Sequence, residues 1–437
     1  MKRFRILAMA MGVVMALTAC GGKQGKDESD SQSKKSGDKD QITITYESWT
    51  PTKEYMDRIL TAFHKEHPEI NVEVTLHANA SEYMTAVQTA FASGEGPDVF
   101  MFADPTALNQ LKSQIEPLDQ YCTDEWGESW ADDFVASAIG DNSIDGVPYG
   151  LPMPTAPAGT MWYNKTLLDS LDLEAPTNYE ELKKVSDTLR EAGKQPLLIG
   201  AKDSWVVIDT FQTILNDFAG DKQYKAYNKE IPFTDSEFVD AFEMWQKLFK
   251  EKIFQDSAFS MTEYMDTYNQ FNDEGIAGMW VNGAWNMDMY TNPEIEDSVA
   301  KNEWGISYFP DLNGDGKQPN LLLTSGGFAI NKNSEEKEAA WELIKFMACD
   351  EGAVIECQRT MAPSGYLNTP QPSYDLPENG LKNLDTVNKL MADQPLQFRG
   401  INDPNVSEKM YEVLTKLAYE KITPEDAAEE IDAVINE

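Results

Sequence analysis

The sequence predicts an α/β protein of two units, and three observations support this. Short segments with alternating apolar residues, the period of a strand, are separated by longer segments whose apolar residues recur at helical spacing. Pro and Gly concentrate in "GVPYGLPMP", residues 146–154, which marks a crossing between two such series. The chain has 437 residues, which is enough for two or three domains.

The first unit starts with a strand, because Ile42, Ile44 and Tyr46 alternate. A helix is predicted from Thr52 until Pro68, and the strand "NVEVTL" follows. A second helix is predicted over residues 81–94, and then "DVFMF" is a near-continuous apolar run, typical of a strand buried on both faces. This β-α-β-α-β order predicts a parallel sheet with right-handed crossovers.

The second unit has the strand patterns "TMWYN", "PLLIG", "IAGMWV" and "GISYFP", with helices between them. Two of these helices are predicted to begin with capping boxes, one at Thr177 and Glu180 and one at Thr234 and Glu237. The segment "GGFAINKNSEEKEAAWELIKFMAC" indicates strand, turn and helix. The C-terminal tail is predicted to hold two helices, the second starting at Thr423.

The N-terminal sequence predicts that the protein is located outside the cytoplasm. "MKRFR" is basic, and "ILAMAMGVVMAL" is an apolar run of the length of a signal-peptide core. It ends in "LTAC", which resembles a bacterial lipobox, so residues 1–19 are predicted as a lipoprotein signal peptide and Cys20 as the lipidated residue. The alternative is a plain signal peptide with an incidental Cys20. Residues 20–40 are otherwise Gly, Ser and charged, and predict a flexible tether to the cell membrane.

Composition excludes several functions. The formal net charge of −38 disfavours binding to nucleic acid, anionic lipid or a polyanionic substrate, whereas neutral and cationic ligands remain compatible. Cys122, Cys349 and Cys357 have no metal or redox spacing and are expected as buried thiols, with a bond between the last two left open. With three His in the chain, we expect neither a zinc site nor a cofactor.

The ends of predicted strands indicate where a ligand site lies. In open α/β sheets, ligands bind beyond the carboxyl ends of the strands. That rule selects Trp49, Asp104, Asn164 and Trp285, and Tyr163 ends its strand. In "GMWVNGAW", Trp280 lies within the strand and is predicted to be core, whereas Trp285 follows the Asn-Gly turn and is predicted to face a ligand.

The chain resembles the extracellular solute-binding proteins of ABC importers, in the carbohydrate-binding family that includes maltose-binding protein. The resemblance is carried by the lipobox and tether, "ASGEGPDVFMF", "MWYNKTLLDSLDLEAPTNYEEL", "AGMWVNGAW", "GGFAINKNSEEKEAAWELIKFM" and "TPEDAAEEI", in that order. It implies a periplasmic-binding-protein-like clamshell with discontinuous lobes joined by hinge strands. By analogy, residues 41–150 and 320–350 form lobe 1, and residues 151–319 and 351–437 form lobe 2.

The resemblance also implies a sugar site, in which aromatic rings stack on apolar sugar faces and planar polar groups bond hydroxyls. "NGAW" matches the family's cleft tryptophan and "WYNK" its cleft tyrosine. The ligand-binding residues expected on this basis are Trp285, Tyr163, Asp104, Trp49, Glu82, Gly326, Gly327, Trp205 and Arg359. For two of them a structural role is the alternative: Asp104 could cap the following helix, and Glu82 could simply favour its helix N-terminus.

The resemblance implies a non-enzymatic function: a monomer that binds a small carbohydrate and delivers it to the membrane subunits of an ABC permease. A binding protein for a polyamine or peptide is the first alternative, and a secreted glycoside hydrolase is the second. Tyr411 in "SEKMY" is the possible substitute for an aromatic that some family members carry there. "DLNGDG" at Asp311 resembles half a calcium loop, but its twelfth position is Leu322, so a surface turn is the preferred interpretation.

Overall fold

The computed structural model describes residues 41–78, 80–154, 156–323, 326–370, 372–393, 397–401 and 403–437. The predicted signal peptide, Cys20 and the tether lie outside these ranges. Within them, no helix is both long enough and apolar enough to cross a membrane.

The first sheet has five strands in the order β2-β1-β3-β13-β6. β1 pairs in parallel with both β2 and β3, as the β-α-β-α-β pattern predicts, and β13 returns antiparallel to β3. All four residues of β3 are buried, in agreement with its continuous apolar run. The strands of this sheet are β1 (Ile42–Ser48), β2 (Ile70–Leu76), β3 (Val99–Phe102), β6 (Leu151–Pro152) and β13 (Gly327–Ile330).

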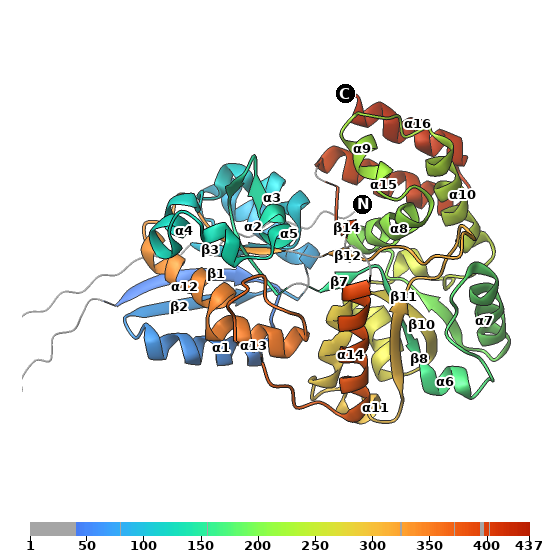
Figure 1. Ribbon diagram of the computed structural model, residues 1–437, viewed down its shortest axis with the longest axis horizontal. Coiled ribbons are helices and arrows are strands. Elements are labelled where there is room, and N and C mark those ends of the chain that lie inside the picture. The colour runs from blue at the N-terminus through green and yellow to red at the C-terminus, as the bar shows by residue number, and fades with distance from the viewer. Residues whose placement is uncertain are drawn as a thin grey trace, which may run out of the picture. The chain divides into compact units, whose positions relative to one another are not determined.

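Helices cover the first sheet because each has one apolar face. α1 buries Met56, Ile59, Ala62 and Phe63 at helical spacing. In Figure 1, α1 and α13 lie side by side, and α13 also contacts α12. The helices that precede β6, together with the first two that follow β13, are α1 (Lys53–Glu66), α2 (Ala80–Ser93), α3 (Pro105–Leu111), η1 (Lys112–Gln114), α4 (Asp119–Trp126), η2 (Trp130–Asp133), α5 (Ala136–Asp141), α12 (Lys337–Cys349) and α13 (Glu351–Thr360).

The second sheet has the order β11-β8-β10-β9 and mixed strand direction. β9 runs parallel to β10, but β8 runs antiparallel to both β10 and β11. Asn282, at the carboxyl end of β10, therefore pairs with Thr160 at the start of β8. The strands are β8 (Thr160–Asn164), β9 (Gln195–Leu198), β10 (Ala277–Asn282) and β11 (Trp304–Tyr308).

A large apolar core forms where α8, α10, α15 and α16 pack on the second sheet (Figure 1). Trp245 on α10 is fully buried in it and donates its indole N–H to the Leu414 carbonyl. The remaining helices are α6 (Lys165–Asp169), α7 (Tyr179–Glu191), α8 (Ser204–Phe218), α9 (Lys222–Tyr227), α10 (Ser236–Lys250), η3 (Ala258–Ser260), η4 (Glu263–Thr267), η5 (Asn269–Asp273), η6 (Ala284–Tyr290), α11 (Glu296–Val299), α14 (Glu378–Asp393), α15 (Pro404–Ala418) and α16 (Pro424–Ile435).

Only one of the three predicted capping boxes or helix starts has the expected form. At α16, Thr423 and Asp426 form a complete capping box. At α7 the N-cap is Asn178, whose side chain accepts from the Glu181 N–H, so the box at Thr177 and Glu180 is wrong by one residue. At α10 the N-cap is Asp235, which makes no side-chain cap bond. Both differences arise because Asn and Asp compete with a neighbouring Thr for the same cap position.

A third sheet joins segments that connect the other two. It has the order β14-β12-β7, with β7 (Pro157–Ala158), β12 (Leu322–Leu323) and β14 (Gln397–Phe398). β7 lies between β6 of the first sheet and β8 of the second, and β12 lies between β11 and β13. A short hairpin, β4 (Ser143–Ile144) with β5 (Val147–Pro148), precedes the first of these crossings.

The C-terminal crossing differs from the expected boundary after residue 350. α13, over residues 351–360, packs on α1 and α12 and so continues the first lobe, although it also contacts η6. α14 in contrast packs on β11 of the second sheet. The chain therefore passes to the second lobe between α13 and α14.

Candidate functional site

Three aromatic side chains from different elements of the second lobe come together, and we call them the aromatic wall. Trp205 lies on α8, Tyr264 on η4 and Trp285 on η6. The rings of Trp205 and Tyr264 stack with centroids 5.7 Å apart, and those of Trp205 and Trp285 are 6.0 Å apart and tilted. Tyr264 keeps 38% of its surface exposed, so its ring is open to a ligand.

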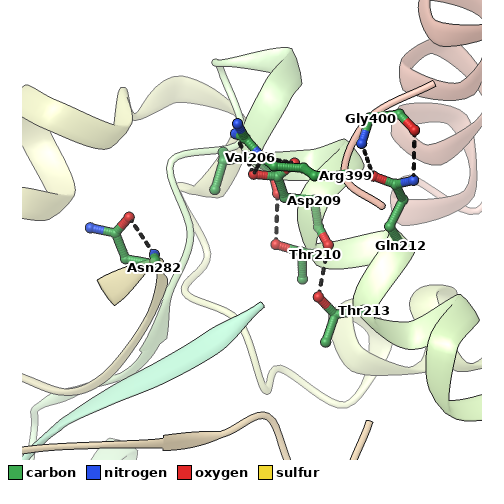
Figure 2. A network of polar contacts seen from close by, with 9 residues as sticks. Val206, Asp209, Thr210, Gln212, Thr213, Asn282, Arg399 and Gly400 are labelled. Carbon is green, nitrogen blue, oxygen red and sulfur yellow. Dashed lines mark hydrogen bonds and ion pairs between the residues drawn. The ribbon is translucent and has the colours of Figure 1, made fainter. Parts of the chain in front are cut away.

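A buried arginine lies against this wall. The Arg399 guanidinium carbon is 5.6 Å from the ring centroids of both Trp205 and Trp285, within the range of a cation–π contact. The same guanidinium forms a fork with Asp209 of α8: Nε donates to both carboxylate oxygens at 2.9 Å and Nη2 donates to Oδ2 at 2.7 Å (Figure 2). The fork leaves the guanidinium plane fixed between the two indoles.

The backbone beside Arg399 is fixed to the same helix. Figure 2 shows the Gln212 side chain of α8 bonded twice to Gly400: its Nε2 donates to the Gly400 carbonyl at 2.9 Å, and its Oε1 accepts from the Gly400 N–H at 2.8 Å. Trp205, Asp209 and Gln212 follow each other at helical spacing, so one face of α8 carries all three. α8 is thus the element that positions the site.

Asp104, a residue of the first lobe, lies near this site. It follows β3, and its carboxylate lies close enough to Arg399 and Asp209 to act on the pKa of both. Its side chain also accepts from the Ala107 N–H at 2.8 Å and so caps α3. The two roles proposed for Asp104 are compatible, because a carboxylate oxygen can accept more than one hydrogen bond.

The charges of the site are balanced by burial and pairing. Burial raises the pKa of Asp209, the Arg399 guanidinium lowers it, and Asp104 adds a smaller upward effect. Because Arg399 is 8% exposed and its partner carboxylate is nearly as buried, the pair is largely shielded from water. Within the structure as described, the Asp104 carboxylate adds a further negative charge beside this pair.

Trp285 takes its orientation from the turn before it. Its ring covers Gly283, so closely that a Cβ there would lie 2.1 Å from the ring. Asn282 accepts the Gly283 N–H through its own side chain, and this bond ends β10 (Figure 2). The Trp285 indole N–H is buried and has no hydrogen-bond partner among the residues that the structure describes, which leaves a donor for a ligand acceptor. Trp280, in contrast, is fully buried in the core of the second lobe, as predicted.

Tyr163 does not join the aromatic wall. Because β8 is antiparallel to β10, Tyr163 pairs with Met279, three residues before Asn282, and not with the end of the strand that leads to Trp285. Its ring packs over Gly305 of β11 and against the core of the second lobe. Because β8 runs antiparallel to β10, the carboxyl ends of the two strands lie at opposite edges of the sheet, and a role of Tyr163 in ligand binding stays a prediction.

Trp49 and Glu82 lie in the first lobe. Trp49 is half-buried, and its ring is 4.9 Å from that of Tyr83 on α2. Glu82 lies in the first turn of α2 and is exposed. Their role in ligand binding stays a prediction.

Gly326, which precedes β13, and Gly327, its first residue, allow a close approach of backbone and side chains. A Cβ at Gly326 would lie 2.5 Å from the Phe102 carbonyl oxygen, and one at Gly327 would lie 1.7 Å from Asn142 Oδ1. These positions are packed inside the first lobe beside the end of β3. Their glycines are thereby explained by packing, and contact with a ligand stays a prediction.

Arg359 lies on α13 and forms an ion pair within its own helix. Its Nη2 is 2.8 Å from the Glu356 carboxylate, which is buried, and the Arg359 side chain is 11% exposed. Asp288 of η6 is near enough to raise the pKa of Arg359 further. Burial raises the pKa of Asp288 to about 6, and Arg359 opposes this. Arg359 therefore lies near the helix that carries Trp285 but not in the aromatic wall.

Arg399 and Tyr264 carry no recognisable signal in the sequence, and Asp209 carries only a local one. Arg399, Asp209 and Tyr264 come from separate segments, and the Arg399–Asp209 pair spans 190 positions. The spacing of Trp205, Asp209 and Gln212 within an apolar helix pattern is the one local signal, since buried polar residues on one helix face indicate a buried network.

Three further expectations concern residues outside the wall. Tyr411 packs on the core of the second lobe and donates its hydroxyl to the Ala201 carbonyl at 3.0 Å. In "DLNGDG", the Asp311 carboxylate accepts the N–H groups of Gly314 and Gly316, which closes the turn on itself. Cys122, Cys349 and Cys357 are buried free thiols, as expected.

The fold and the site agree with comparisons to known proteins. Residues 46–354 match the family described as bacterial extracellular solute-binding protein. The chain belongs to this family. An uncharacterized ABC transporter extracellular-binding protein of Pyrococcus horikoshii is 23% identical over 298 residues, which are 67% of this chain and 64% of that relative.

Other members of the family have named ligands. A galactooligosaccharide-binding protein of Bacillus subtilis is 22% identical over 361 residues, covering 82% of this chain and 79% of its own. The structure of maltose-bound MalE3 of T. maritima superimposes with a TM-score of 0.73 at 22% identity, covering 90% of this chain and 99% of that one. The match to such solved structures confirms the two-lobed α/β fold.

Proposed function

We propose that this family member binds a sugar or oligosaccharide outside the cytoplasm and delivers it to an ABC permease, without itself catalysing a reaction. The aromatic wall beside the Arg399–Asp209 pair carries the proposal, because rings match the apolar faces of a sugar and fixed charged groups match its hydroxyls. The named ligands of several relatives are sugars, which supports this class.

The chemistry of binding follows from the groups at the site. A pyranose ring stacked on Trp285 or Trp205 removes apolar surface from water on both partners. The unpartnered Trp285 N–H offers a donor, and the Asp104 and Asp209 carboxylates offer acceptors for hydroxyl groups. Because Asp104 comes from the first lobe and the wall from the second, one ligand in contact with both favours the conformation in which the lobes meet.

The cell-surface part of the proposal rests on the leader sequence. We infer that residues 1–19 are removed and that a lipid on Cys20 holds a monomeric body at the outer face of the cell membrane. Mass spectrometry of the protein purified from membranes tests this directly. A mature N-terminus at any residue other than a lipidated Cys20 contradicts the anchor while leaving the sugar site untouched.

The sugar site is tested by removing its rings singly. We expect Trp285→Ala and Trp205→Ala each to weaken sugar binding about tenfold or more, since stacking of a sugar on an aromatic ring contributes on the order of 1 kcal/mol or more. The measurement is isothermal titration against a library of mono- and oligosaccharides. Trp130→Ala is the matched control, because Trp130 is also half-buried but packs on the core of the first lobe.

The outcomes separate the candidate functions. Binding that is lost in both wall variants and kept in Trp130→Ala supports the site. Normal binding by Trp285→Ala removes the wall from the site. Stabilisation by polyamines or peptides and by no sugar rejects the carbohydrate class, and turnover of an oligosaccharide rejects the binding-protein function.

A further inference from the structure

Glu263, the residue before Tyr264, is a fully buried carboxyl group. Its exposed fraction is 0%. Oε2 accepts the Gly200 N–H at 2.8 Å and the Thr267 hydroxyl at 3.2 Å, while Oε1 is buried near the Trp280 indole N–H and forms no regular hydrogen bond to any residue that the structure describes. The proposed sugar site makes no direct use of this group, so its burial needs another explanation.

The backbone around Glu263 is fastened to the segment that leads into α8. The Glu263 N–H donates to Asp203 Oδ2 at 2.8 Å, and the Lys202 N–H donates to the Met261 carbonyl at 3.1 Å. Gly200 fits because a Cβ there would lie 2.4 Å from the Glu263 nitrogen and 2.6 Å from Oε2. The carboxyl group therefore closes a tight junction between the end of β9 and the 261–273 segment.

This junction determines where Tyr264 lies. Glu263 begins η4, a π-helical turn, and η5 continues it. Such turns are rare and occur mostly at functional sites. Glu263 points inward onto Gly200, and the next residue, Tyr264, points to Trp205, whose helix begins four residues after Gly200. The junction therefore connects the segment that carries Tyr264 to the segment that carries Trp205.

We propose that Glu263 is a positioning residue of the ligand site, whose side chain fixes the 261–273 segment on Gly200 and so holds Tyr264 against Trp205. The proposal rests on the proposed function, because the two rings matter to binding only if the aromatic wall receives the ligand. Glu263 itself touches no ligand in this scheme.

The protonation state of Glu263 affects how firmly its side chain holds this junction. Burial raises the pKa of Glu263 to about 8, while the Gly200, Thr267 and Trp280 donors oppose that rise and Asp203 adds to it. The adjacent Tyr264 also interacts electrostatically with Glu263, although its ring points to Trp205. Glu263 is thus mostly protonated at pH 7. Above pH 8 the Glu263 carboxylate is a buried charge beside Asp203, with one oxygen that lacks a regular hydrogen bond, and this loosens the junction.

The test is the pH profile of sugar affinity in the full chain. At pH 9 about a tenth of the molecules keep the proton, so the wild-type dissociation constant should rise about tenfold between pH 7 and pH 9. Glu263→Gln keeps the shape and the acceptor for the Gly200 N–H but cannot ionise, so its affinity should stay flat. Asp217→Asn is the matched control, because Asp217 is an acid of raised pKa, to about 7, at the other end of α8.

Two results decide the proposal. A Glu263→Gln profile that falls with pH as the wild type does overturns it, as does a flat wild-type profile. Hydrogen exchange of residues 261–273 without ligand gives an independent answer: at pH 9, corrected for intrinsic rates, wild type should exchange faster than Glu263→Gln. Equal exchange in the two proteins overturns the inference, even if no sugar binds. If wild type exchanges faster than Glu263→Gln but no sugar binds at any pH, only the proposed function is rejected.

Discussion

At the scale of single residues, Gly283 shows how a small side chain fixes a large one. The ring of Trp285 occupies the space where a Cβ would stand at Gly283, with three ring carbons within 2.3 Å of that position. The backbone there has φ of −80°, which any residue adopts, so glycine is needed for space and not for conformation. The pose of Trp285 therefore depends on the residue two positions before it.

Gly283→Ala should accordingly weaken ligand binding while the protein stays folded. The added methyl group displaces the indole from Arg399 and Trp205, and we expect a loss of affinity of about tenfold, similar to loss of one stacking contact. Calorimetric titration measures the affinity, and far-ultraviolet circular dichroism measures the fold. Gly140→Ala is the control, since its Cβ meets nothing within 4 Å. Unchanged affinity in Gly283→Ala contradicts the role given to the ring.

Single residues also show which features of the site could be predicted from the sequence. Trp280 and Trp285 could be told apart because one lies within a strand pattern and the other follows an Asn-Gly end. Arg399 could not be found, because its importance depends on Asp209, which lies 190 positions away and carries no motif. A buried ion pair between distant segments is created by the fold, and no local pattern encodes it.

At the scale of elements, α8 is the frame of the site. Its buried residues include five polar ones, and two of them, Asp209 and Gln212, hold the 399–400 segment. A helix surface with satisfied polar groups can fix a loop that has no regular structure of its own. The same segment follows β14, which pairs with β12 in the small sheet between the lobes.

Removing the Gln212 side chain should loosen that segment. In Gln212→Ala, the N–H and carbonyl of Gly400 lose their partners, and we expect a loss of unfolding free energy of about 1–3 kcal/mol. Hydrogen exchange of residues 397–401 should accelerate, and sugar affinity should fall because Arg399 is less fixed.

Gln246→Ala serves as the comparison for this experiment. Gln246 also donates to two backbone carbonyls, those of Leu417 and Ile422, but it lies on α10. It should lose stability without any change in exchange at 397–401. Equal exchange of that segment in both variants removes Gln212 from the role of a clamp.

Strand direction is the element-scale property that the sequence did not reveal. Every strand of the second sheet was recognised from its apolar pattern, yet β8 runs opposite to β10, so Tyr163 lies away from Trp285. Alternation of side chains is the same in parallel and antiparallel strands, and only the connections decide the direction. The parallel pairing of β1 with β2 and β3 was predicted correctly because β1 and β2 are each followed by a crossover helix, whereas the antiparallel return of β13 was not predicted.

At the scale of the whole molecule, two kinds of acidic group act on stability. The chain has 74 Asp and Glu against 36 Lys and Arg, so its surface charges repel one another at neutral pH. A smaller group of acids has a pKa raised by burial, to about 8 for Glu263, about 7 for Asp217 and about 6 for Asp288. The first kind responds to salt and the second to pH.

The buried acids predict that stability decreases from mildly acidic to alkaline pH. Between the unfolded pKa near 4 and the folded value, the native state keeps a proton that the unfolded chain has released, so unfolding free energy falls as pH rises. We expect the melting temperature to be higher at pH 5.5 than at pH 8.5. Surface carboxylates are ionised at both values, so screening by salt should raise the melting temperature about equally at each pH and leave the difference between them.

A double variant, Glu263→Gln with Asp217→Asn, isolates the buried contribution. Both substitutions keep the acceptor oxygens but remove the titration, so the drop in melting temperature between pH 5.5 and pH 8.5 should become smaller than in wild type. If salt abolishes the pH difference in wild type, surface repulsion accounts for it and the buried acids do not. If the double variant keeps the full difference in high salt, neither Glu263 nor Asp217 titrates in the native state over this range.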